Sequence, residues 1–188
     1  PGKGELEMSI LVNNDTRLAV AGITGREGSF HTLNNRAYGT NVVGGINPKK
    51  AGENVEGIPV FANWADTVAE TQANTAMIFV PPPFAAASAL EAAQAGVELV
   101  VIITEGIPAH DELKLYNQVK RDHPNTRIVG PNCPGILSPG EAAMLRIPSD
   151  ASPRPWLVSI AGARSVEVCA VRKFAGVCLA STEFTRFA

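Results

Sequence analysis

The sequence VAGITGREGSF (residues 20–30) sets the interpretation of the rest of the chain. It continues an apolar segment, TRLAVAG, into three glycines at three-residue spacing, Gly22, Gly25 and Gly28. Glycine at the end of a strand permits a tight turn, and further glycines let backbone N–H groups approach an anion at the start of a helix. The sequence therefore predicts a strand, a phosphate-binding turn and a helix. A structural turn without a ligand is the alternative, because glycine-rich turns are common.

Short apolar segments alternate with helix-compatible segments between residues 16 and 129. Strands are expected within residues 16–22, 41–47, 58–61, 75–80, 97–106 and 126–135, and helices within residues 29–39, 62–72, 84–96 and 110–124. The segments at 77–80 and 99–103 are apolar throughout, which is typical of parallel strands covered on both faces. Repeated strand–helix–strand units with right-handed crossovers predict an α/β fold with a doubly wound, mostly parallel sheet.

Ligands of such sheets bind beyond the carboxyl ends of the strands. Five loops fall at that edge: GITGREG, GINPKK, VPPPF, ITEGIP and GPNCPG. The first has the spacing G-x-x-G-x-x-G rather than G-x-G-x-x-G, and no acidic residue ends the second strand to hold a nicotinamide ribose. Lys49 and Lys50 instead suggest a further phosphate there, with solvated loop lysines as the alternative. Glu105 could accept hydrogen bonds from a ligand or cap the following helix.

The composition restricts the class of protein. The chain has 188 residues, of which 45% are hydrophobic and 18% charged, as in one large globular domain or one domain with a fragment of a second. With a net charge of −2 the chain has no excess of basic residues, so we expect no nucleic acid partner. Apolar runs such as ELVVIIT are far shorter than the ~20 residues of a membrane-spanning helix. Cys133, Cys169 and Cys178 form no close pair, which favours a reducing compartment. We expect a cytoplasmic location, or an organellar matrix in a eukaryote.

Catalytic patterns are not visible. The chain shows no Ser/His/Asp order and no Cys/His metal spacing, so we expect no metal site. The lone His31, His110 and His123 are expected to be surface or core histidines rather than catalysts. We expect Cys133 to be a small buried hydrophobe rather than a nucleophile.

Four segments resemble the α subunit of succinyl-CoA synthetase (succinate–CoA ligase). They are residues 9–52 (SILVNNDTRLAVAGITGREGSFHTLNNRAYGTNVVGGINPKKAG), 58–61 (IPVF), 78–111 (from IFVPPPF to ITEGIPAHD) and 127–141 (RIVGPNCPGILSPGE). The resemblance implies a Rossmann-like domain at residues 9–142 that binds coenzyme A (CoA). Residues 1–8 are expected to be an extension, with Met8 as the natural start, and residues 143–188 a divergent tail.

The resemblance also implies which residues hold the ligand. Those implied to contact CoA are Thr24, Gly25, Arg26, Glu27, Lys50, Ile103, Thr104 and Glu105. Those implied to support the site are Gly22, Gly28, Pro81, Asn132, Cys133 and Pro134.

The family reaction converts succinate, CoA and a nucleoside triphosphate to succinyl-CoA, the diphosphate and phosphate, in the citric acid cycle. The resemblance implies a β subunit as partner, which binds ATP or GTP with Mg, and a histidine in a Gly-His-Ala-Gly loop that relays the phosphoryl group. This sequence contains no such loop, so no catalytic residue is expected in it. Only VSIAGARS faintly resembles the start of the second domain. A frame shift or mis-joined exon, or a truncated paralogue, would explain the departure.

Three functions are therefore compared. The first is the CoA-binding part of a succinate–CoA ligase α subunit, inactive by itself. The second is a stand-alone, non-catalytic CoA-binding module. The third is a nicotinamide-dependent dehydrogenase, which the glycine spacing and Lys49-Lys50 disfavour.

Overall fold

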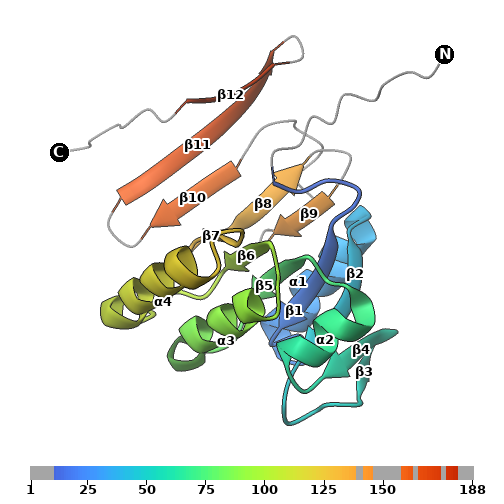
Figure 1. Cartoon of the computed structure of the whole chain (residues 1–188). Helices are drawn as coiled ribbons and strands as arrows, with labels where there is room; N and C mark the ends of the chain where they lie inside the picture. The colour runs from blue at the N-terminus through green and yellow to red at the C-terminus, as the bar shows by residue number, and fades with distance from the viewer. Residues whose placement is uncertain (1–10, 139–141, 146–157, 163–164, 175–176, 182–188) are drawn as a thin grey trace.

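The computed structural model describes residues 11–138, 142–145, 158–162, 165–174 and 177–181 (Figure 1). The expected extension at residues 1–8 lies outside this part, as does much of the expected tail. The elements are β1 (Arg17–Ala21), α1 (Arg26–Tyr38), β2 (Asn41–Ile46), β3 (Asn54–Val55), β4 (Ile58–Phe61), α2 (Trp64–Thr71), β5 (Thr75–Ile78), α3 (Pro82–Gln94), β6 (Leu99–Ile102), α4 (Ala109–Asp122), β7 (Arg127–Val129), β8 (Gly135–Ser138), β9 (Ala142–Leu145), β10 (Val158–Gly162), β11 (Ser165–Phe174) and β12 (Val177–Ser181).

The main sheet has seven strands in the order β3-β4-β2-β1-β5-β6-β7. All pairs in it are parallel except β3 with β4, which are antiparallel. The chain runs outward from β1 through β2 to β4 and then returns to the other side of β1 at β5. This order confirms the predicted doubly wound, mostly parallel α/β fold and places its switch point between β1 and β5.

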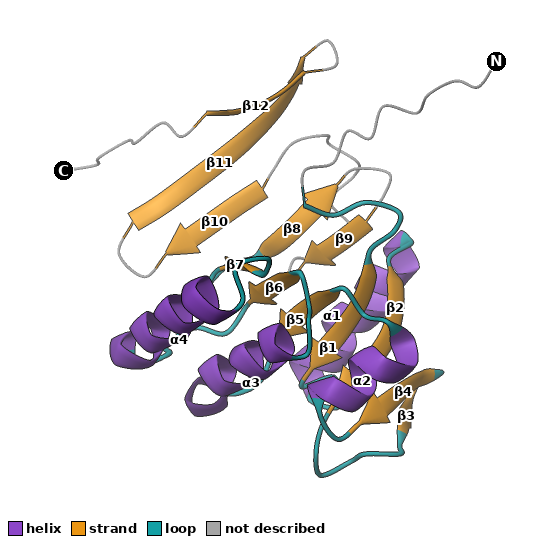
Figure 2. Ribbon diagram, viewed as in Figure 1, coloured by secondary structure: helices purple, strands orange, loops and turns teal. Residues whose placement is uncertain are grey.

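One face of the sheet carries α2, α3 and α4 (Figure 2). Alternate residues of the strands point to it: Val100 and Ile102 of β6 join that core, whereas Leu99 and Val101 join the core of the opposite face. Every residue of β5 and β6 is buried. The prediction that these two strands are covered on both faces is thus confirmed. None of the helices in the described residues is long and apolar enough to cross a membrane.

The other face is covered by α1 and by the β8–β9 hairpin. The Asn35 amide of α1 donates to the Met77 sulfur of β5 at 3.6 Å. The Thr40 hydroxyl, after α1, donates to the Ala143 carbonyl at 2.7 Å and accepts from the Ala143 N–H at 2.8 Å. Met144 is fully buried in the same core. The domain boundary expected at residue 142 therefore falls at the first residue of a strand that packs on this fold.

Two predicted helix starts are wrong. Helix α1 begins at Arg26, three residues before the expected start at Ser29, because extended Gly25 caps it and Gly28 allows its first turn to lie against the glycine loop. Helix α3 begins at Pro82 rather than at Phe84. The expected elements leave residues 81–83 between strand and helix, but proline also fits the first turn of a helix, where its fixed φ and missing N–H cost nothing.

The strands that were not anticipated are β3, β8, β9, β11 and β12. The β3–β4 hairpin turns through Glu56 (φ 51°) and Gly57 (φ 90°). Strand β10 pairs antiparallel with β11, which pairs antiparallel with β12.

Candidate functional site

The carboxyl ends of β1 and β5 lie side by side at the switch point. The Phe79 N–H, one residue past β5, donates to the Ala21 carbonyl at 2.9 Å. A Cβ on Gly22 would lie 3.1 Å from the carbonyl carbon and oxygen of Phe79, and Gly22 has φ +85°. Glycine is required here because the turn after β1 must run along the backbone of the next loop. The turn therefore opens at the place where doubly wound sheets bind ligands.

The glycine loop leaves the start of α1 exposed. Gly25 caps the helix without a side chain, and Gly25, Arg26 and Glu27 are all exposed. The first N–H groups of a helix have no intrahelical acceptor, and the helix dipole makes this end positive. An anion can approach the N–H groups of Arg26 and Glu27 closely, because no capping side chain competes for them. The Gly25 N–H donates to the Gly22 carbonyl at 3.0 Å within the turn.

Asn47, at the end of β2, connects the glycine loop to the two lysines. Its side-chain amide donates to the Thr24 hydroxyl oxygen at 2.5 Å, and its side-chain oxygen accepts from the Lys49 N–H at 3.0 Å. Its backbone carbonyl accepts from the Lys50 N–H at 3.0 Å. The turn that carries both lysines is therefore hydrogen-bonded to the loop after β1.

The ion pair that Lys50 makes within the chain is weak enough for a phosphate to replace it. The Lys50 ammonium lies 3.4 Å from the Glu53 carboxylate, with the two side chains 48% and 55% exposed. Exposed pairs of this kind contribute little to stability. A phosphate placed at this turn could replace Glu53 as the partner of Lys50 at small cost.

The loop after β6 is held against the loop after β5. The Thr104 hydroxyl donates to the Val80 carbonyl at 2.7 Å, so its hydrogen is used within the protein. The Ile103 side chain is buried in the core, whereas Glu105 and Pro81 are exposed. Pro81 caps α3, whose N-terminal turn therefore also faces this edge. Ile103 can meet a ligand only through its backbone.

The GPNCPG loop packs against the end of β6. A Cβ on Gly130 would lie 2.3 Å from the Ile102 carbonyl oxygen, and Gly130 has φ +97°. Asn132 adopts φ +54° and its N–H donates to the Thr104 carbonyl at 3.1 Å. The Tyr116 hydroxyl donates to the Gly130 carbonyl. These contacts hold the loop beside the Thr104 loop.

Cys133 is buried in the same loop. Its thiol donates to the Ile102 carbonyl at 3.3 Å. Burial raises the pKa of Cys133 to about 11, because the thiolate would be poorly solvated. The thiol therefore stays neutral near pH 7 and is a poor nucleophile.

Alkylation of Cys133 by iodoacetamide at pH 8 is expected to be about a hundredfold slower in the folded chain than in urea, because the thiolate is scarce and buried. The raised pKa of Cys133 also stabilises the folded chain. This contribution is fully present below pH 9.0, the ordinary pKa of the thiol, and is lost as the pH rises through about 11. Mass spectrometry of the peptide that contains Cys133 measures the alkylation rate. Equal rates in the two states would contradict the prediction.

Two side chains beside this edge were not predicted as site residues. His31 of α1 is buried, stacks on Phe79 with ring centroids 5.6 Å apart, and places its Nε2 3.5 Å from the Glu27 carboxylate. The spacing of Glu27 and His31 by four residues on a helix is the signal that could have found this pair. Asn47 gave only a weaker signal, its position between an apolar strand and two lysines.

Comparison with known families decides the kind of domain. Residues 13–106 match the family model described as "CoA binding domain", which is half of the 188-residue chain. The chain belongs to the CoA-binding domain family. The match includes the glycine loop, the lysine turn and residues 103–105, whereas Asn132, Cys133 and Pro134 lie outside it.

Individual relatives extend this result. This chain is 55% identical over 135 residues to the ADP-forming succinate–CoA ligase subunit alpha of Aquifex aeolicus, covering 72% of this chain and 44% of that protein. It is 47% identical over 139 residues to the malate–CoA ligase subunit alpha of Methylorubrum extorquens, covering 73% and 47%. The chain thus spans about half the length of such relatives.

One relative matches more of the chain. The succinate–CoA ligase subunit alpha 1 of Archaeoglobus fulgidus is 40% identical over 174 residues, covering 92% of this chain and 59% of that protein. This similarity must extend past residue 142, into the part of the sequence that was expected to diverge. Among solved structures, the dinucleotide-forming acetyl-coenzyme A synthetase 1 of Ca. Korarchaeum cryptofilum aligns with a TM-score of 0.61 and 28% identity, covering 73% of this chain and 31% of that one.

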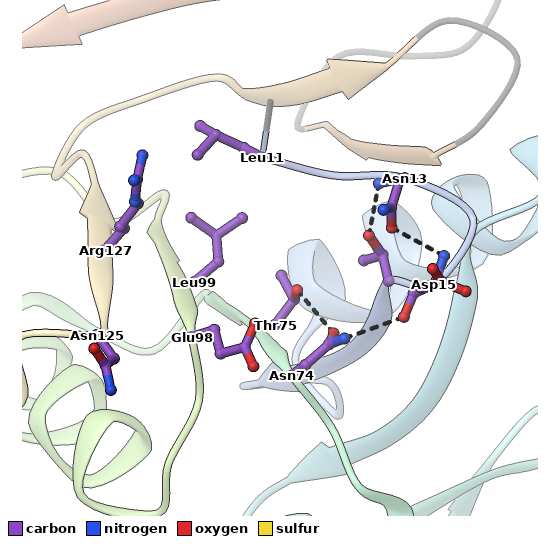
Figure 3. Close-up of a pocket in the computed structure, with 10 residues that line it drawn as sticks. Leu11, Asn13, Asp15, Asn74, Thr75, Glu98, Leu99, Asn125 and Arg127 are labelled. Carbon is purple, nitrogen blue, oxygen red and sulfur yellow. Dashed lines mark hydrogen bonds between the residues drawn. The ribbon is translucent and has the colours of Figure 1, made fainter. Parts of the chain in front are cut away.

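A separate pocket of about 360 Å³ opens at the opposite edge of the CoA-binding domain's sheet (Figure 3). Its polar side chains bond one another and the nearby backbone: the Asn74 amide donates to the Asp15 carbonyl and the Asn74 oxygen accepts from the Thr75 hydroxyl, both at 3.1 Å. The lining residues are Leu11, Asn13, Asp15, Thr16, Asn74, Thr75, Glu98, Leu99, Asn125 and Arg127. None of them is a predicted site residue, and the amino ends of strands are not where such sheets bind ligands.

Within the described residues, no group of three or more His, Cys, Asp or Glu side chains could hold a metal ion.

Proposed function

We propose that this chain binds CoA at the carboxyl edge of its sheet, as the CoA-binding part of a succinate–CoA ligase α subunit. The observation that carries the proposal is the glycine-capped, exposed start of α1, which lies inside the region matched by the CoA-binding family. The relatives named as succinate–CoA ligase α subunits support the identity of the enzyme.

Different residues would contact different parts of CoA. The N–H groups of Arg26 and Glu27 would hold a phosphate of CoA, with Gly25 lining the site and the Thr24 hydroxyl as a further donor. Lys50 would hold a second phosphate by a charge-assisted hydrogen bond. The edge formed by Ile103, Thr104 and Glu105 would lie beside the pantetheine chain.

The whole enzyme would join CoA to succinate in the citric acid cycle, with ATP or GTP and Mg bound by a β subunit. One relative is named as a malate–CoA ligase, so the dicarboxylate needs its own test. The 188 residues contain no Gly-His-Ala-Gly loop, and we assign no residue to phosphoryl relay. The cellular location, cytoplasm or organellar matrix, stays a prediction.

Calorimetric titration of the chain with CoA, using NAD as the control ligand, tests the proposal. We expect saturable binding of CoA and none of NAD. Binding of NAD without CoA would favour the dehydrogenase hypothesis. Binding of neither ligand would overturn the proposal for the isolated chain. Titration of the CoA-bound chain with a β subunit then separates an enzyme part, which assembles, from a stand-alone module, which does not.

Lys50→Ala is expected to weaken CoA binding by about 1–3 kcal/mol, because one charge-assisted phosphate contact is lost. The dissociation constant from calorimetry measures this effect. Lys114→Ala, an exposed lysine of α4, is the matched control for loss of one positive charge and should leave the constant unchanged. An equal effect of the two substitutions would remove Lys50 from the site.

A further inference from the structure

The Thr24 hydroxyl needs a defined orientation to serve an anion. A hydroxyl can both donate and accept, so without a fixed partner its hydrogen rotates among several directions. Thr24 lies in the glycine loop one residue before the cap of α1 and is only partly buried. The group that fixes the direction of this hydrogen therefore decides whether the hydroxyl donates a hydrogen bond to the ligand or accepts one from it.

Asn47 supplies this orientation. Its side-chain oxygen accepts from the Lys49 N–H, which can only donate, so the amide cannot be turned around without losing that bond. The amide nitrogen must therefore face Thr24, and it donates to the Thr24 hydroxyl oxygen at 2.5 Å. Because the hydroxyl accepts on this side, its hydrogen has to point elsewhere. Within the described part of the chain, the Thr24 hydroxyl donates to no acceptor.

Asn47 itself is held on both sides. Its backbone N–H donates to the Phe61 carbonyl at 3.0 Å, and its carbonyl accepts from the Lys50 N–H at 3.0 Å. The following residue, Pro48, further restricts the backbone. One side chain thus joins the glycine loop after β1 to the lysine turn after β2, on neighbouring parallel strands.

We propose that Asn47 is a positioning residue, which turns the Thr24 hydroxyl hydrogen toward the phosphate of the ligand and couples this contact to the Lys49-Lys50 turn. The inference rests on the proposed binding of CoA, and it adds a residue that is not among the predicted contacts. Asn47 need not touch the ligand: it acts through Thr24.

A double-mutant cycle on the full chain, with CoA as the ligand, tests this proposal. Thr24→Val is expected to raise the dissociation constant about tenfold, as for loss of a hydrogen bond to a charged group. Asn47→Ala is expected to raise it about fivefold. The double variant should raise it about tenfold rather than about fiftyfold, because Asn47 has nothing to orient once the hydroxyl is gone. Thermal unfolding of each variant reports whether it is folded.

Two further variants separate positioning from a structural role. Asn54→Ala is the matched control, since the Asn54 side chain also accepts a backbone N–H in a nearby turn, that of Gly57, and should not change CoA binding. Asn47→Asp keeps an acceptor for the Lys49 N–H but would accept the Thr24 hydrogen instead of donating to Thr24. Introduced into the wild-type chain, Asn47→Asp should raise the dissociation constant for CoA by a factor at least five times larger than when it is introduced into the Thr24→Val chain. In the Thr24→Val chain there is no hydroxyl to turn, so only the added negative charge affects binding.

The outcomes are distinct. If the wild-type chain binds CoA and the fold-increases in the dissociation constant multiply in both cycles, Asn47 and Thr24 act independently. That result would overturn the positioning role of Asn47 but not the proposed CoA site. A wild-type chain that does not bind CoA would overturn the proposed function and this inference with it. If Asn47→Ala does not fold, the Asn47→Asp cycle decides the question.

Discussion

Gly28→Ala is expected to lower the free energy of unfolding by about 3 kcal/mol or more and to abolish binding at the glycine loop. A Cβ on Gly28 would lie 2.1 Å from the carbonyl oxygen of Gly22 and 2.8 Å from its carbonyl carbon. Both are backbone atoms, and the Gly22 carbonyl is held by the Gly25 N–H at 3.0 Å. The clash can be relieved only by moving the first turn of α1 away from β1, which displaces the N–H groups that would face the phosphate.

Gly96→Ala is the control for this substitution. Gly96 follows α3 with φ +92°, and a Cβ there would meet nothing within 4 Å. Its cost is that of a left-handed backbone alone, about 1 kcal/mol, and CoA affinity should not change. Urea unfolding and calorimetry measure both variants. If the two substitutions destabilised the chain equally, the close contact of α1 with the glycine loop would not be limiting.

Trp64→Ala is expected to destabilise the chain by about 3–5 kcal/mol, which is the range for a large aromatic residue removed from a core. Trp64 begins α2 and is fully buried between the sheet and α3. Its indole N–H donates to the Ser88 hydroxyl at 3.0 Å, and its backbone N–H donates to the Glu91 carboxylate at 3.0 Å. The substitution leaves a cavity and removes one hydrogen bond between α2 and α3.

Ser88→Ala separates these two contributions, because it removes the acceptor of the indole N–H and leaves the ring in place. We expect a loss of about 1 kcal/mol for this variant. Urea unfolding at constant pH measures both free energies. Similar losses for Trp64→Ala and Ser88→Ala would show that the hydrogen bond, rather than ring burial, holds α2 to α3.

The elements that were predicted are those with strong local signals. The apolar segments at β5 and β6 had to be buried on both faces, and the alternation of strands with helices had to give a parallel sheet. The helix starts were predicted less well, since the glycine and proline residues there are found both in loops and in the first turn of a helix. Gly28 reads as loop in the sequence but lies inside α1, where its missing side chain is needed.

The sequence of this protein was sufficient for its doubly wound fold and for the edge at which its loops gather, because both follow from local periodicity and from the handedness of strand–helix–strand connections. Only the tertiary structure revealed the bond from Asn47 to Thr24, the stack of His31 on Phe79 and the burial of Met144 against the second face. These contacts join segments that are distant in the chain or depend on side-chain direction. No local pattern encodes such contacts, because they exist only once the strands have paired.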